Sequence, residues 1–447
     1  MAPPPSHQTL PPRFADLKRE IAASHPEFQT RVTKAWTELL AALEERTGEI
    51  IAAGPNASLS VSRAILCRID APILWPINFM DLQSLTSEQR LNLKRKGCLI
   101  IRDVVEDAQA TAWKTGLDEF VKINPTADGF PEGNKQFFNL YWTKPQVQAR
   151  QHPNVLAASA WLNNLFHTKS DKKLEGVDLS TPLSYADRFR MRQPGGYWDA
   201  HPPHVDGGGI ERWEDPAFRA VFGDILAGVN WREHDPYDIE ARLEARTSTY
   251  GRKGQASCFR TFQGWLAMTQ ISPGNGTLQL FPDIVLSNAY LILRPFFRPA
   301  SPALAQSMDA KDWVFDTSDS DWPAIVPGEV GFLGPYPTAK LHPHLRLDGA
   351  MTSIPTVRPG DMVFWHCDMI HAVEPEHTGQ EDSAVMYIGA VPTTPHNTEH
   401  IKEQLPTFLA AAPPPDYPQG VSEAGYIGIG LESDVVGLGR AAMGLAY

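Results

Sequence analysis

Short segments with the pattern of β-strands, separated by glycine and proline, follow one another from about residue 183 to about residue 392. They lie in YADRFRMRQPGG, FRTFQGWLAMTQI, GTLQLFP, IPTVRPGDMVFWHCDMIHAV and SAVMYIGAVP. Many short strands with turn signals between them are typical of a β-sandwich or a jelly roll. The pattern therefore predicts an α+β protein whose core is a double-stranded β-helix, a cupin-like jelly roll, with helices packed outside it.

The helical patterns lie mostly before these strands. FQTRVTKAWTELLAALEERTGEIIAAG has apolar residues at helical spacing from Val32 to Ile50 and closes at Gly54–Pro55. TSEQRLNLKRKG predicts a helix that begins at a Thr86 cap and ends at Gly97, ahead of a short strand, CLII. DAQATAWKTGLDEFVKIN predicts a further helix directly afterwards.

The domain organisation follows from these two sequence patterns, the helical one and the strand-like one. Residues 1–85 are expected to form an N-terminal helical extension packed on the core. Residues 86–447 are expected to form the double-stranded β-helix domain, with a helical insertion at about 210–257 that contains DPAFRAVFGDIL and DIEARLEART.

Composition excludes several classes of function. The net charge of −12 argues against nucleic acid or an anionic membrane as the main partner. No run approaches the roughly 20 apolar residues that cross a bilayer, and the N-terminus has no apolar signal region. The cysteines are scattered without a CxxC pair, which favours reduced thiols in a cytoplasmic protein. They are Cys67, Cys98, Cys258 and Cys367.

The segment HPPHVDGGGIERW gathers candidate metal ligands. His204 and Asp206 are two residues apart, and residues at i and i+2 of a strand face the same side, so both can reach one metal. His201 precedes Pro202–Pro203, which break strand alternation, and is expected at the rim of the site. Gly207–Gly209 match no phosphate-binding loop and are expected to turn the chain.

A third ligand is expected from PGDMVFWHCDMIHAVEPEH. Pro359–Gly360–Asp361 predicts a turn, a strand follows it, and His366 and His371 come next. Two imidazoles and one carboxylate on one face form the facial triad of non-haem Fe(II) enzymes, which leaves positions open for substrate and O₂. The residues alone leave both histidines open as the third ligand.

Four segments resemble, in order, the Fe(II)/2-oxoglutarate-dependent dioxygenases. They are LKRKGCLIIRDVVEDAQATAWKTGLDEFV, HVD, GWLAMTQISPGNGTLQLFP and PGDMVFWHCDMIHAVE. The resemblance is to the phytanoyl-CoA-hydroxylase-like branch and to a related fungal and bacterial group known as a domain of unknown function. It covers roughly residues 85–395, and nearly the whole chain in the second group.

The resemblance implies that His204, Asp206 and His371 are the catalytic residues and bind Fe(II). It also implies 2-oxoglutarate as cosubstrate and O₂ as oxidant. The reaction would be hydroxylation or oxidative cyclisation of a small molecule, with a small carboxylate or an amino-acid-like compound of secondary metabolism as the expected substrate.

The chain departs from the pattern of this family at one point. Many members have an arginine or lysine shortly after the distal histidine, where it binds the far carboxylate of 2-oxoglutarate. Here the first basic residue after His371 is Lys402. A guanidinium suits a carboxylate because it can form two parallel hydrogen bonds. The candidates for binding the cosubstrate are Arg188, Arg190 and Arg192 on one strand face, together with Arg260 and Trp265. SCFRTFQGW places Arg260 on the strand that ends at Trp265.

Two other functions use the same residues. One is a metal-dependent, cupin-like isomerase or hydrolase that works without O₂, which the missing basic residue favours. The other is a non-catalytic β-sandwich that binds a carboxylate or a protein partner. Residues 207–257 and Arg294–Ser301 are expected to shape the pocket as a lid.

Overall fold

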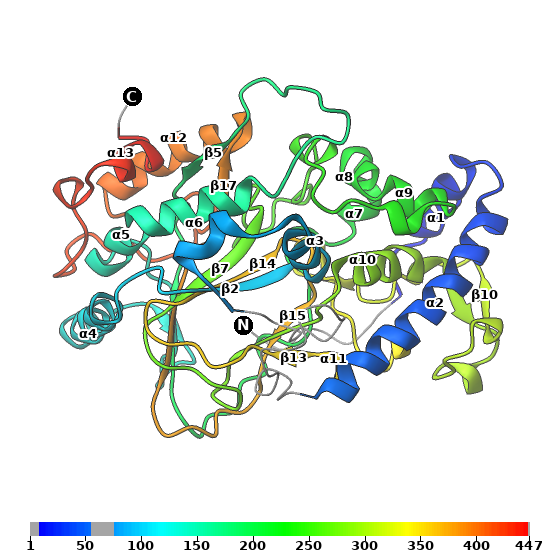
Figure 1. Ribbon diagram of the computed structural model, residues 1–447, viewed down its shortest axis with the longest axis horizontal. Helices are drawn as coiled ribbons and strands as arrows, with labels where there is room; N and C mark the ends of the chain where they lie inside the picture. The colour runs from blue at the N-terminus through cyan, green and yellow to red at the C-terminus, as the bar shows by residue number, and fades with distance from the viewer. Residues whose placement is uncertain (1–8, 55–75, 446–447) are drawn as a thin grey trace.

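The centre of the fold is an eight-stranded sheet in the computed structural model, which describes residues 9–54 and 76–445 (Figure 1). The strand order is β1-β2-β14-β7-β16-β6-β4-β3, and every neighbouring pair is antiparallel except β1–β2. The strands are β1 (Pro76–Asn78), β2 (Cys98–Arg102), β3 (Gly129–Phe130), β4 (Phe137–Phe138), β6 (Phe189–Arg192), β7 (Phe262–Ala267), β14 (Met362–His366) and β16 (Ser383–Tyr387). All residues of β7 and β14 are buried, because other parts of the chain cover both faces of these strands.

A smaller sheet has the order β13-β8-β15. Its strands are β8 (Leu278–Leu280), β13 (Thr352–Ser353) and β15 (His371–Val373). His204 pairs with His371 as an isolated antiparallel bridge and so extends this sheet by one residue. The remaining strands form pairs: β5 (Asp178–Leu183) with β17 (Val391–Thr393), β9 (Phe297–Pro299) with β10 (Trp313–Phe315), and β11 (Val326–Pro327) with β12 (Phe332–Leu333).

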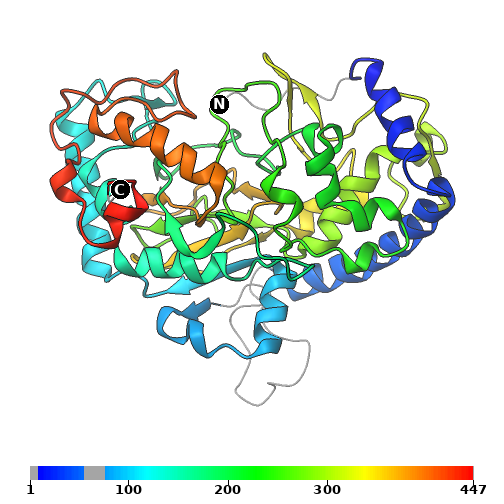
Figure 2. The ribbon, with the colours of Figure 1, turned by 90° about the horizontal axis from the view of Figure 1, so that it is seen from above.

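Helices surround the sheets. The N-terminal helices α1 (Arg13–Ala23) and α2 (Phe28–Ala53) lie at one end of the molecule, and α12 (Pro395–Leu409) and α13 (Leu438–Ala442) lie at the other (Figures 1 and 2). The other main helices are α3 (Ser87–Lys96), α4 (Asp107–Ile123), α5 (Lys144–Arg150), α6 (Pro153–Asn163) and α10 (Ile284–Leu293). Across residues 9–54 and 76–445, no helix is both long and apolar enough to span a membrane.

The helix α2 is joined to the core by aromatic packing. Trp36 is buried and stacks on Phe297, with ring centroids 4.5 Å apart. Trp36 and Trp265 belong to one continuous apolar cluster. The division of the chain into two domains at residue 85 stays a prediction.

Several local predictions are confirmed. The helix over residues 28–53 ends at Gly54, and α3 begins with a capping box in which Thr86 and Gln89 bind each other's backbone. Gly97 ends α3 with φ of 74°, which glycine adopts without a Cβ clash. The cysteines within the described ranges, Cys98, Cys258 and Cys367, are free thiols. Pro55 and Cys67 lie outside the described residues.

The helical insertion differs in part from its prediction. Short helices are present as α7 (Glu211–Glu214), α8 (Pro216–Val221) and α9 (Gly223–Ala227), but DIEARLEART forms only a 3₁₀ turn at Ala241–Leu243. The reason is Arg242, which is buried and donates to the Asp368 carboxylate (2.6 Å) and the Pro236 carbonyl (3.0 Å). These tertiary bonds replace a regular helix because a buried guanidinium must keep its partners.

Candidate metal centre

His204, Asp206 and His371 meet at the edge of the smaller sheet. The backbones of His204 and His371 exchange two hydrogen bonds of 2.9 Å, which brings their ring centroids to 4.1 Å from each other. The two carboxylate oxygens of Asp206 lie 3.7 Å from His204 Nε2 and 3.5 Å from His371 Nε2. All three ligand atoms fall within 4.8 Å of one another, so the group could hold one metal ion.

The hydrogen bonds of the two rings determine which nitrogen can bind a metal. His204 Nδ1 donates to the Pro202 carbonyl (2.6 Å), and His371 Nδ1 donates to the Met369 carbonyl (3.0 Å). A carbonyl only accepts, so each Nδ1 carries the proton and each Nε2 lone pair faces Asp206. Ligand atoms about 2.1 Å from a six-coordinate metal and 90° apart lie about 3.0 Å from each other. The observed separations are therefore close to those of a metal-bound set.

The charges of the three groups also suit a divalent metal. Burial is the main cause that lowers the pKa of His204 to about 4, and the neighbouring His371 lowers it further, so the ring is neutral. Burial raises the pKa of Asp206, but the Arg260 guanidinium, and a proton on the Nε2 of either neighbouring imidazole, lower that pKa far below its usual value, so Asp206 is ionised. Two neutral imidazoles and one carboxylate form the donor set of a facial triad with Fe(II).

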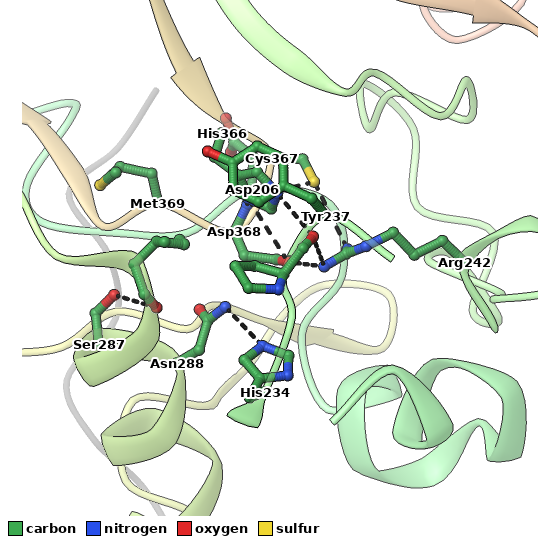
Figure 3. A network of polar contacts seen from close by, with 12 residues as sticks. Asp206, His234, Tyr237, Arg242, Ser287, Asn288, His366, Cys367, Asp368 and Met369 are labelled. Carbon is green, nitrogen blue, oxygen red and sulfur yellow. Dashed lines mark hydrogen bonds and ion pairs between the residues drawn. The ribbon is translucent and has the colours of Figure 1, made fainter. Parts of the chain in front are cut away.

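The alternative ligand His366 lies elsewhere. Its ring is fully buried, stacks on Phe166 with centroids 5.3 Å apart, and donates from Nε2 to the Pro236 carbonyl (3.0 Å). His366, Cys367 and Asp368 are close enough to form a second candidate metal cluster. Two buried arginines already neutralise Asp368, as Figure 3 shows for Arg242, so this cluster has no need of a cation.

His201 lies beside the triad, as predicted for a rim residue. Its Nδ1 accepts a hydrogen bond of 2.8 Å from Trp198 Nε1, and the two rings stack with an interplanar angle of 2°. The ring lines the cavity in front of the triad.

Sequence reasoning missed the buried arginine that joins the two ligand segments. Arg212, in α7, donates from Nη1 to the Asp368 carboxylate and from Nη2 to the backbone carbonyl of Asp206, both at 2.7 Å. Asp368 belongs to the turn before His371, so one guanidinium connects the chain at Asp206 to the chain at His371. No local signal could identify this pair because the two residues are 156 positions apart.

We expect Arg212→Met to weaken metal binding about 10- to 100-fold, the range typical of groups that support metal ligands. In this variant Asp368 still pairs with Arg242. The loss of unfolding free energy should therefore stay near the lower end of the roughly 3–5 kcal/mol typical of broken buried pairs. Anaerobic Fe(II) titration and chemical unfolding measure the two effects separately. Arg232→Met is the matched control, because Arg232 is 57% exposed and pairs with Glu38. Metal affinity equal to that of the unmodified protein would contradict a positioning role for Arg212.

A cavity of about 190 Å³, the triad cavity, opens in front of the three candidate ligands. Its aromatic wall consists of Phe130, Phe137, Trp265, Tyr336, Trp365, Tyr387 and Tyr417. Trp265 is buried and lines this wall, and its role as a cofactor contact stays a prediction. The centroid of the Trp365 ring lies 5.2 Å from that of His371. The cavity combines an apolar wall with a few polar groups, which is typical of small-molecule sites.

The predicted arginines separate into two groups. Arg188, Arg190 and Arg260 line the triad cavity, whereas Arg192 does not. Arg192 donates to the backbone carbonyls of Glu374 (2.5 Å) and Pro375 (2.7 Å), so its guanidinium holds the chain together. Arg192 therefore lies outside the triad cavity, and the prediction that it binds the cosubstrate is wrong.

Arg190 is the arginine with unused donors deep in the triad cavity. Its side chain is 2% exposed, and its one hydrogen bond within the described ranges runs from Nη2 to the Gly276 carbonyl (3.3 Å). Its Nε and Nη1 atoms are buried without a partner there. A buried guanidinium with free donors is costly unless a ligand binds it, so this site suits an anion.

The structure defines this chain as an α+β protein with a candidate metal centre of two histidines and one carboxylate. The sequence pattern of the Gig2-like family matches residues 8–445, and the chain belongs to this family. It is 30% identical over 386 residues to YbiU of Escherichia coli (strain K12), covering 83% of this chain and 86% of YbiU. The crystal structure of GlcNAc Inducible Gene 2 from Candida albicans has 31% identity and a TM-score of 0.83, covering 100% of this chain and 91% of that one. A structure named as a candidate oxidoreductase from Salmonella typhimurium LT2 has 27% identity and a TM-score of 0.79, covering 98% and 99%.

Proposed function

We propose that this protein is a non-haem Fe(II)/2-oxoglutarate-dependent oxygenase that acts on a small molecule. The observation that carries the proposal is the triad of His204, Asp206 and His371, with both Nδ1 atoms held by carbonyls, in one cavity with the unpartnered guanidinium of Arg190. The description of the Salmonella typhimurium relative as a candidate oxidoreductase supports the same class.

The strand order supports a double-stranded β-helix. In one sheet the inner strands follow the order β6-β16-β7-β14. In the smaller sheet the bridge at His204 pairs with β15, followed by β8 and β13. A jelly roll requires eight antiparallel segments in two groups of four whose neighbours are not consecutive in the chain, and this strand order supports that proposal.

Each group of residues has a separate task in this proposal. When bound, Fe(II) with 2-oxoglutarate and O₂ would supply the oxidant for a C–H bond of the substrate, and 2-oxoglutarate would be converted to succinate and CO₂. Asp206 and the two histidines hold the metal on one face and leave its other positions open. Arg190 neutralises the distal carboxylate of the cosubstrate, while Trp265 and Trp365 exclude water from the cavity.

The place of Arg190 accounts for the missing basic residue after His371. Arg190, on β6, pairs with Val385 on β16. In the chain, β16 is the next strand after β15, which carries His371. The neighbouring strand β6 therefore supplies the guanidinium that relatives of this oxygenase class supply from the strand after the distal histidine.

Anaerobic addition of Fe(II) and 2-oxoglutarate to the metal-free protein tests the proposal. We expect a weak visible charge-transfer band that needs both additions, because the keto acid must chelate the bound metal. Glutarate, which lacks the keto group, is the control and should give no band. Iron binding without a band would favour the O₂-independent cupin-like enzyme, and no iron binding would contradict both.

A further inference from the structure

A second cavity, of about 460 Å³, adjoins the triad cavity. The residues that line both are Asp206, Gly207, Ala256, Arg260 and Gln263. Pockets that bind small molecules commonly measure roughly 300–1,000 Å³. The second cavity therefore has room for a small-molecule substrate, whereas the triad cavity suits a compact cosubstrate. Asp206 is the member of the triad that both cavities share.

The insertion and the chain before β7 build this second cavity. Its lining includes residues 242–248 and 256–260, which supports the predicted role of the region 207–257 in shaping the pocket. The other predicted lid segment, Arg294–Ser301, lines neither cavity. Arg294 instead donates to the backbone carbonyls of Leu341 (2.9 Å) and Phe297 (2.7 Å).

Two side chains at the junction of the cavities carry unused donors. Arg260 makes no hydrogen bond with the described part of the chain, and its ion pair with Asp187 is long, at 3.6 Å. Asp187 is already bound by Arg188 Nε at 3.1 Å, so one carboxylate serves two guanidiniums. Gln263 is 6% exposed, and its Nε2 has no partner within the described ranges.

These donors are separate from the group assigned to the cosubstrate. Arg190 lines the triad cavity and not the second one, whereas Arg260 and Gln263 line both. A buried amide N–H and a guanidinium that face the same space together match a carboxylate, which accepts several hydrogen bonds.

We propose that the second cavity binds the substrate to be oxidised, and that this substrate is a small molecule with a carboxylate that binds Arg260 and Gln263. The inference rests on the proposed function, because that function assigns the triad cavity to the metal and cosubstrate. A carboxylate at the junction would hold the remainder of the substrate beside Asp206 and therefore near the metal.

Trifluoroacetate, observed by fluorine NMR, is the probe for this site. The protein is first loaded with Mn(II) and saturated with 2-oxoglutarate, so that Arg190 is occupied and a paramagnetic ion marks the metal position. We expect the trifluoroacetate signal to broaden on binding, and trifluoroacetamide, a neutral analogue of similar shape, to stay sharp. Arg260→Gln should weaken trifluoroacetate binding at least about 10-fold, since a charged hydrogen-bonding partner is lost.

Further variants separate a binding role from a folding defect. Gln263→Leu should also weaken the probe, while Arg232→Gln, at an exposed position outside both cavities, should not. The Fe(II)–2-oxoglutarate band in each variant reports whether its metal site is intact. Equal broadening by trifluoroacetamide, or unchanged trifluoroacetate binding in an intact Arg260→Gln protein, would overturn the inference. Absence of the band in the unmodified protein would instead overturn the proposed function.

Discussion

Replacing Asp206 with alanine is expected to lower the affinity for Fe(II) at least about 100-fold and to abolish 2-oxoglutarate turnover. Loss of a group that only supports a ligand already costs about 10- to 100-fold, and Asp206 is the one carboxylate between the two imidazoles. The variant would leave two neutral nitrogen donors, so a divalent metal would lose its anionic ligand. Succinate release and anaerobic Fe(II) titration measure the two losses.

Metal-linked stability gives an independent measurement of the same change. At a metal concentration 100 times the dissociation constant, binding adds about 2.7 kcal/mol to the free energy of unfolding of the native protein. We expect this increment to disappear in Asp206→Ala and to persist in Asp199→Ala, the matched control, because Asp199 is exposed and lines neither cavity. A metal-dependent increase in stability that survives in Asp206→Ala would contradict the assignment of Asp206 as a ligand.

Local signals predicted much of the fold. The capping box of Thr86 and the stop at Gly97 depend on residues a few positions apart, so the sequence pattern was sufficient to predict α3. The mixed α+β class followed from the change of period between the helical and strand segments. The failure at DIEARLEART has a non-local cause, since Arg242 binds Asp368 more than a hundred positions away.

The candidate site was predictable to a similar extent. The spacing of His204 and Asp206 indicated a shared face. For the third ligand the sequence offered both His366 and His371, five residues apart, and only tertiary packing decides between them. The structure places His371 beside them through the backbone bridge with His204, and places His366 against Phe166. Which histidine joins the triad therefore depends on pairing between segments far apart in the sequence, and hydrophobic periodicity does not predict such pairing.

The arginines show the limit of strand periodicity. Alternation placed Arg190 and Arg192 on one face of β6, but it did not say which of them reaches the cavity. Tertiary packing decides this. The Arg192 guanidinium lies against Gly276, where an added Cβ would come within 2.3 Å of Arg192 Nη1, so a larger residue at this position would displace the guanidinium. Arg192 then binds backbone carbonyls, and Arg190 keeps its free donors.

Arg190→Gln is therefore expected to weaken 2-oxoglutarate binding about 30-fold or more, while Fe(II) binding is retained. Removing one partner of a buried, hydrogen-bonded charge pair costs roughly 2–5 kcal/mol, and 1.4 kcal/mol corresponds to a factor of ten. The measurement is titration of the charge-transfer band with 2-oxoglutarate in the iron-loaded protein. Arg190→Lys should recover part of the affinity, because it restores the charge but not the paired donors.

Arg192→Gln is the matched control, since it removes the same group two residues away on the same strand. Its guanidinium binds the backbone carbonyls of Glu374, Pro375 and Gly196, so the substitution should lower the free energy of unfolding and leave the affinity of the folded protein for 2-oxoglutarate nearly unchanged. The two variants thus separate ligand binding from structural support. If Arg190→Gln bound 2-oxoglutarate as tightly as the native protein, the carboxylate partner would have to be another guanidinium of the triad cavity. Arg260 would then be assigned to the cosubstrate, and the second cavity would lose its anion site.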